Sequence, residues 1–139
     1  MSAYINVPTI SYEKAAEAVR LTIEIGQERD LKLCATVVDP GLNMVAYGRA
    51  DRTTPHSVET SRRKANTAAS TRKPSADVPS ELADALENGT GTLLTRIPGG
   101  VPLAFDGVVV GGLGVAGGPP AKDAEVAAAV LEALGGSLH

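Results

Sequence analysis

The chain is poor in aromatic residues and in cysteine. Its 139 residues include no tryptophan, one phenylalanine, three tyrosines and one cysteine, and its net charge is −3. A surface that stacks nucleic-acid bases needs several exposed aromatic rings, and a dedicated nucleic-acid-binding domain normally carries a basic excess. Both shortages therefore argue against a nucleic-acid partner, and the single cysteine excludes an internal disulfide.

Long apolar runs and metal-ligand clusters are also missing. No run approaches the roughly 18 apolar residues of a spanning helix, and the first residues lack the basic and apolar regions of a signal peptide. We therefore expect a cytoplasmic protein with no membrane partner. The two histidines, His56 and His139, form no cluster with metal-ligand spacing, so we expect no metal site. Cys34 lies in an apolar run, which predicts a buried structural thiol.

The hydrophobic periodicity predicts helices that alternate with strand pairs. We expect helices at 11–29, from about 57 to 71, at 81–87 and at 122–134, and strands at 32–39, 44–49, 93–97, 101–105 and 108–115. Ser11 is the expected N-cap of the first helix. Thr54 followed by Pro55 is the expected start of the second helix, with Ser57 as the alternative cap. Asp106-Gly107 is typical of a type I′ turn. Because tight turns join consecutive strands, we expect an antiparallel sheet covered by helices, an α+β domain formed by residues 1–139.

Arg62, Arg63 and Lys64 form a basic cluster in the second helix of an acidic protein. One interpretation is a solvated helix face. The other is a binding site for ligand carboxylates, because arginine binds them in a bidentate manner. Glu59 lies four residues before Arg63, at the spacing of a helical ion pair.

The last third of the chain is rich in glycine. Residues 112–117 match G-x-G-x-x-G, but two prolines follow at once and too few residues remain for a second parallel strand, so a dinucleotide site does not fit. Glycine lets the backbone approach a ligand closely. The glycines proposed for that role are Gly99, Gly100, Gly114, Gly117 and Gly118. The alternative is close packing of a strand on a helix or on another subunit.

His56 lies at the predicted start of the second helix, close in sequence to Glu59. Its imidazole is suited to ligating iron or to acid–base chemistry. A solvated loop histidine without such a role is the alternative.

Four motifs in order resemble the GlcG/HbpS family over residues 9–135. They are the segment from Val37-Val38-Asp39-Pro40-Gly41 to Asp51, Ser57 with Lys64-Ala65-x-Thr67-Ala68, Pro98-Gly99-Gly100-Val101-Pro102-Leu103, and Gly111-x-x-Gly114-Val115-x-Gly117-Gly118 before an acidic last helix. The resemblance implies a three-layer α-β-α, profilin-like domain with a five-stranded antiparallel sheet flanked by helices. It also implies a homo-oligomer, and haem binding is known for some members.

By this resemblance the chain is a small-ligand-binding oligomer, with haem the best single candidate for the ligand. Arg62 and Arg63 would face carboxylates, and the glycines would supply backbone contacts. The region 9–31 contains no histidine, which leaves His56, Thr54, Thr95 or Tyr47 as the iron ligand, or no haem at all. One rival is a cofactor-independent isomerase or lyase acting on a small carboxylated metabolite, with His56 or Glu59 as its acid or base. Another is a structural or regulatory partner domain.

Overall fold

The computed structural model describes residues 1–138, and His139 lies outside the described residues. The elements in order are α1 (Tyr12–Glu28), β1 (Cys34–Val38), β2 (Met44–Arg49), α2 (Ser57–Thr71), the short 3-10 helices η1 (Ser75–Asp77) and η2 (Ser80–Leu82), α3 (Ala83–Gly89), β3 (Gly100–Phe105), β4 (Val108–Ala116) and α4 (Pro120–Ala133). This succession confirms the α+β class.

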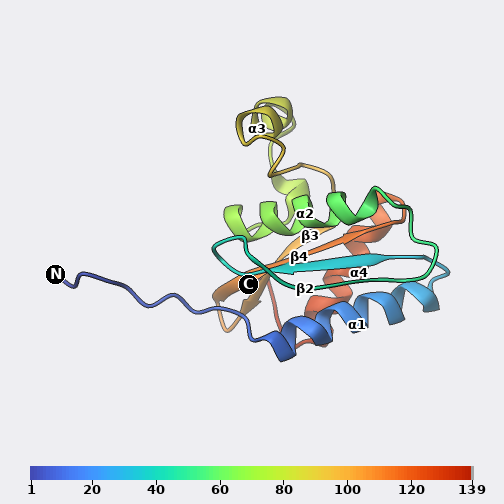
Figure 1. The fold of residues 1–139 in the computed structure, drawn as a ribbon, viewed down its shortest axis with the longest axis horizontal. Helices are drawn as coiled ribbons and strands as arrows, with labels where there is room; N and C mark the ends of the chain where they lie inside the picture. The colour runs from blue at the N-terminus through green and yellow to red at the C-terminus, as the bar shows by residue number, and fades with distance from the viewer. Residues whose placement is uncertain (139) are drawn as a thin grey trace.

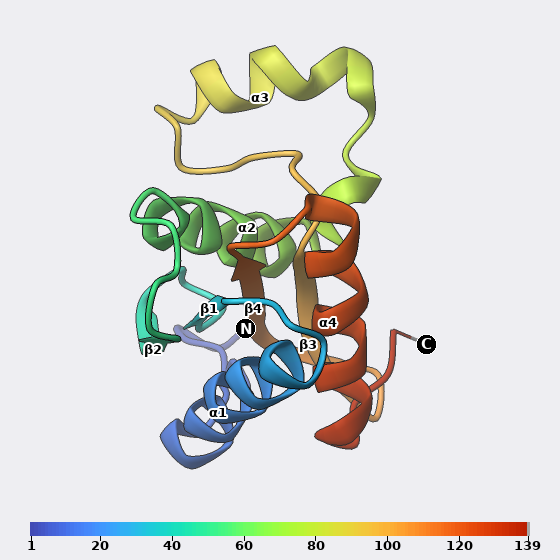
Figure 2. The ribbon, with the colours of Figure 1, turned by 90° about the vertical axis from the view of Figure 1, so that its right-hand side faces the viewer.

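The strands form one antiparallel sheet in the order β2-β1-β4-β3. Helix α2 covers one face of the sheet, and α1 and α4 cover the other (Figures 1 and 2). The expected three layers are therefore present. The turn between β3 and β4 has φ of 53° at Asp106 and 78° at Gly107, which agrees with the predicted type I′ turn.

The sheet has an apolar face and a polar face because alternate residues of a strand point in opposite directions. Ala35 and Val37 belong to the main core, which lies between the sheet, α1 and α4. Thr36 points to the other face, where its Oγ1 lies 2.7 Å from Ser61 Oγ of α2. Cys34 is fully buried on the same side and donates to the Ser57 carbonyl at 3.3 Å, which confirms the prediction of a buried thiol.

Three glycines let the α2 backbone lie directly on the sheet. A Cβ on Gly114 would stand 1.9 Å from the Ser61 carbonyl oxygen, and one on Gly112 would stand 2.3 Å from that of Ala65. At Gly100 the distance to the Lys64 carbonyl oxygen would be 2.3 Å. Real side chains do not approach backbone so closely, so close strand-to-helix packing explains these three positions.

The prediction of a fifth strand at residues 93–97 is wrong. Within residues 1–138 the sheet has four strands, and residues 93–97 form no ladder. Their backbone is bonded by side chains instead: the Thr95 N–H donates to Thr67 Oγ1 at 2.8 Å, and the Leu94 N–H to Thr90 Oγ1 at 3.3 Å. With its donors satisfied in this way, the segment has no need of a neighbouring strand, and β3 is left as an edge.

One helix cap is as predicted and one is not. Ser11 Oγ accepts the Lys14 N–H at 3.1 Å and caps α1. Helix α2 has His56 at its N-cap position, with no side-chain cap bond. The predicted caps, Thr54 and Ser57, bond to each other through their hydroxyls at 2.5 Å. That bond, in a turn closed by Ser57 N–H to Thr54 O, keeps both hydroxyls from capping the helix.

Two segments stand away from the sheet. The α3 region projects beyond α2, and the N-terminal residues run out as an extended segment (Figure 1). Both carry exposed apolar side chains, among them Tyr4 and Ile5 at the N-terminus and Leu82 before α3. Within residues 1–138 no helix combines the length and hydropathy needed to cross a bilayer.

Candidate functional site

A hollow of about 360 Å³ opens where α2 and α4 begin. From the α2 side it is lined by Thr54, His56, Ser57, Thr60 and Lys64. The opposite wall consists of Ile97, Ala116, Gly117, Gly118, Pro120 and Asp123. Two helix N-termini and the segment that leaves β4 therefore meet around one space.

The hollow has a buried ion pair in its wall. Lys64 Nζ lies 3.0 Å from Asp123 Oδ2, and each side chain is only 1% exposed. Lys64 also donates to the Val115 carbonyl at 2.8 Å. The other Asp123 oxygen, Oδ1, accepts the Gly118 N–H at 3.0 Å. Helix α2, strand β4 and helix α4 are thus joined at this point by charge-assisted bonds.

Burial perturbs both members of the pair. Desolvation lowers the pKa of Lys64 and raises the pKa of Asp123, and the opposite charge of the partner counteracts each shift. A buried ion pair is weak evidence for stability, because removing two charges from water costs about as much as their attraction returns. Perturbed titratable groups that line a cavity are characteristic of functional sites. The Lys64–Asp123 pair therefore marks this hollow as the candidate site.

His56 lies at the rim of the same hollow. Its side chain is exposed and makes no hydrogen bond within residues 1–138. Its carbonyl accepts the Thr60 hydroxyl at 3.2 Å, so the backbone is held while the imidazole stays free. The lining of the hollow thus includes both an unengaged imidazole and a buried cation.

Only part of the predicted site converges here. Of the proposed residues, His56, Gly117 and Gly118 line the hollow. Gly99, Gly100 and Gly114 are buried instead against α2. Gly99 has a positive φ of 131°, and a Cβ there would lie 2.7 Å from Lys64 Nζ. These three glycines therefore shape the packing around Lys64 rather than the wall of the hollow.

Glu59, Arg62 and Arg63 form a separate cluster on the outer surface of α2. Both Nε and Nη2 of Arg62 donate to the Glu59 carboxylate, and Arg63 Nε donates to it at 3.4 Å. The bond from Arg62 is the main cause that lowers the pKa of Glu59. None of the three lines the hollow. Their arrangement is that of ion pairs on a helix surface, three and four residues apart.

Of the other proposed iron ligands, one lines the hollow and two do not. Thr54 lines the hollow together with His56. Thr95 is buried and donates its hydroxyl to Glu87 Oε1 at 2.5 Å. The Tyr47 hydroxyl is buried without a partner within residues 1–138, and desolvation raises the pKa of Tyr47. Neither Thr95 nor Tyr47 lines the hollow.

The sequence alone did not predict that Lys64 and Asp123 form a site. The predicted basic cluster of the second helix includes Lys64 beside Arg62 and Arg63, and no role is predicted for Asp123. A signal was present, because Lys64 follows Ser61 by three residues and precedes Ala68 by four. Helical spacing places all three on one face, and that is the face buried against the sheet.

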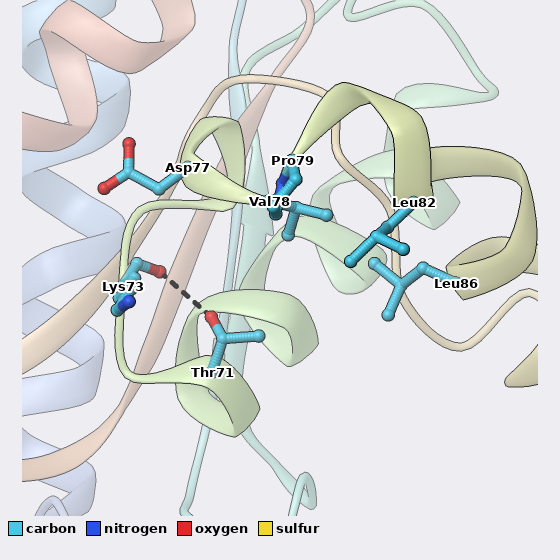
Figure 3. Close-up of a pocket in the computed structure, with 7 residues that line it drawn as sticks. All are labelled: Thr71, Lys73, Asp77, Val78, Pro79, Leu82 and Leu86. Atoms are coloured by element: carbon cyan, nitrogen blue, oxygen red, sulfur yellow. Dashed lines mark hydrogen bonds between the residues drawn. The ribbon is translucent and has the colours of Figure 1, made fainter.

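A second hollow, of about 260 Å³, lies between the end of α2 and α3 (Figure 3). Its walls are mainly apolar, and Figure 3 shows Val78, Leu82 and Leu86 directed toward a common space. The charged residues there, Lys73 and Asp77, are exposed. In the described part of the chain, no three His, Cys, Asp or Glu side chains gather as a metal cluster.

Known proteins resemble this chain along most of its length. A family model described as "Haem degrading protein HbpS-like" matches residues 10–132. Protein GlcG of Escherichia coli strain K12 is 32% identical over 111 residues, which are 76% of this chain and 80% of GlcG. A double mutant of HbpS from Streptomyces reticuli has a TM-score of 0.87 at 29% identity, covering 97% of this chain and 93% of its own. The PduOC:heme complex has a TM-score of 0.86 at 22% identity, covering 94% and 99%, a likeness of fold.

Proposed function

Because the chain belongs to the HbpS-like family, we propose that it is a small-ligand-binding protein and that haem is the principal candidate for its ligand. The observation that carries the proposal is the hollow at the start of α2 and α4, where His56 is free and exposed. The family description names haem degradation, and one structural neighbour is a haem complex.

The donor set of the hollow fits haem. Histidine is the usual proximal ligand of haem iron, and the imidazole of His56 has no competing bond within residues 1–138. Ile97, Ala116 and Pro120 add apolar wall, as a hydrophobic ligand needs. A bound haem would supply redox-active iron, while His56 would hold the iron and the apolar residues would exclude water on their side.

The proposal includes a homo-oligomer in the cytoplasm. Exposed apolar side chains on the N-terminal segment and before α3 support an assembly, because a second copy would cover them. The enzyme rival needs His56 and Glu59 to act together. Glu59 is bound by Arg62 on a different part of α2, so no observation favours that rival.

A spectrophotometric titration with hemin tests the proposal. We expect a Soret shift at micromolar hemin, and for the His56→Ala variant an affinity lower by about tenfold or more, together with a changed Soret position, since an axial ligand is lost. Glu59→Gln, on the same helix but outside the hollow, is the matched control and should bind hemin like the parent protein. Absence of any Soret shift at micromolar hemin would remove haem from the proposal.

A further inference from the structure

Lys64 lines the hollow with an N–H that no group within residues 1–138 accepts, and we infer that the ligand is bound through a carboxylate that accepts a hydrogen bond from the Lys64 ammonium group. The inference rests on the proposed function only in that both place the ligand in this hollow. It concerns the chemical class of the group that is recognised, and it applies with or without haem.

Lys64 has a spare donor. An ammonium group carries three N–H donors, and two of them go to Val115 O and Asp123 Oδ2. The third has no acceptor within residues 1–138, although the side chain is 1% exposed and lines the hollow. A buried N–H without a hydrogen-bond partner is unfavourable. A ligand oxygen that accepts this hydrogen bond would therefore bind favourably there.

Both carboxylate oxygens of Asp123 already accept a hydrogen bond. Its Oδ2 is occupied by Lys64 and its Oδ1 by the Gly118 N–H. Helices α2 and α4 also begin at the hollow, so the positive ends of both helix dipoles face it. Together with the third N–H of Lys64, these positive ends favour an anion over a cation.

The volume limits the ligand to a small carboxylate or to the carboxylate-bearing edge of a larger molecule. About 360 Å³ lies near the lower end of the roughly 300–1,000 Å³ of small-molecule sites. Two sources share the required chemistry: a short free organic acid, and a propionate side chain of haem. Both would place the planar carboxylate against the same donors.

Two titrations separate these sources. In an amide NMR titration at pH 6, sodium propionate should shift the signals of Ser57, Gly117 and Gly118, while uncharged propionamide at equal concentration should not. In an absorbance titration, hemin should bind about tenfold or more tightly than hemin dimethyl ester, which lacks the carboxylates. If propionate causes no shift and the ester binds as tightly as hemin, the inference is wrong and haem binding stands. If propionate binds and hemin does not, the inference stands and the haem proposal fails.

Variants of the ion pair test the same point. Asp123→Asn removes the competing anion while keeping an acceptor for Gly118, so propionate affinity at pH 6 should rise about tenfold. The double variant Lys64→Met with Asp123→Asn should bind propionate about tenfold more weakly than the parent protein. Glu59→Gln, which lies outside the hollow, should leave propionate affinity unchanged. Equal affinity across the parent protein, folded Asp123→Asn and the folded double variant would overturn the inference.

Discussion

Lys64 and Asp123 are 59 residues apart in the chain, yet Nζ of one lies 3.0 Å from Oδ2 of the other. Lys64 belongs to α2 and Asp123 to α4, which cover opposite faces of the sheet (Figure 2). Their contact therefore links the two outer layers of the domain. It also places both charges in the wall of the hollow.

Replacing one residue of this pair should lower the stability of the fold, and replacing both should not. Lys64→Met leaves Asp123 charged and unpaired, so we expect the free energy of unfolding to fall by about 3–5 kcal/mol. The double variant Lys64→Met with Asp123→Leu should lie within about 1 kcal/mol of the parent protein or above it. Urea unfolding followed by circular dichroism measures both. An unchanged midpoint for Lys64→Met alone would contradict the burial of the pair.

The pair should also give a characteristic pH dependence of stability. Burial raises the pKa of Asp123, so above its ordinary pKa of about 3.9 the folded protein binds more protons than the unfolded chain, and stability falls as pH rises through that window. Burial lowers the pKa of Lys64, so below its ordinary pKa of about 10.4 the unfolded chain binds more protons, and stability rises with pH. The contribution of the pair to the free energy of unfolding is therefore smallest near neutral pH.

The measurement compares unfolding free energies of the parent protein and the double variant Lys64→Met with Asp123→Leu across pH. The stability advantage of the variant should be greatest near pH 7 and smaller near pH 4 and pH 10. A difference that is flat over this range would mean that neither group changes its pKa on folding.

Gly114 and Gly89 provide a matched pair for the packing of α2. A Cβ on Gly114 would lie 1.9 Å from the Ser61 carbonyl oxygen, whereas one on Gly89 meets nothing within 4 Å. Gly114→Ala should therefore lower the free energy of unfolding by about 3 kcal/mol or more. Gly89→Ala, at the end of α3, should raise it by up to about 1 kcal/mol. Thermal unfolding of both variants checks this, and a neutral Gly114→Ala would show that α2 can move away from the sheet at little cost.

Local signals predicted much of the fold, and long-range bonds account for what they missed. Ser11 caps α1 and Asp106-Gly107 forms the turn because each depends only on neighbouring residues. Residues 93–97 have the composition of a strand. Their backbone is bonded by the side chain of Thr90, which is close in sequence, and by that of Thr67, 28 residues from Thr95. No local pattern reveals the bond to Thr67.

The sequence also predicted part of the candidate site. His56, Gly117 and Gly118 do line one hollow. Glu59 lies near His56 in sequence, but its carboxylate is bound by Arg62 and Arg63 and does not line the hollow. Asp123 could not be paired with Lys64 from the sequence, because nothing local indicates that α4 begins beside α2.

The glycine-bearing surface under α2 has a consequence for how such domains diversify. Gly100, Gly112 and Gly114 hold the helix backbone against the strands, so the position of Lys64 is determined by main-chain packing that tolerates little change. The rim, by contrast, consists of exposed residues such as Thr54, His56 and Ile97. Substitutions at the rim can therefore change which ligand is bound, while the packing of α2 on the sheet is kept.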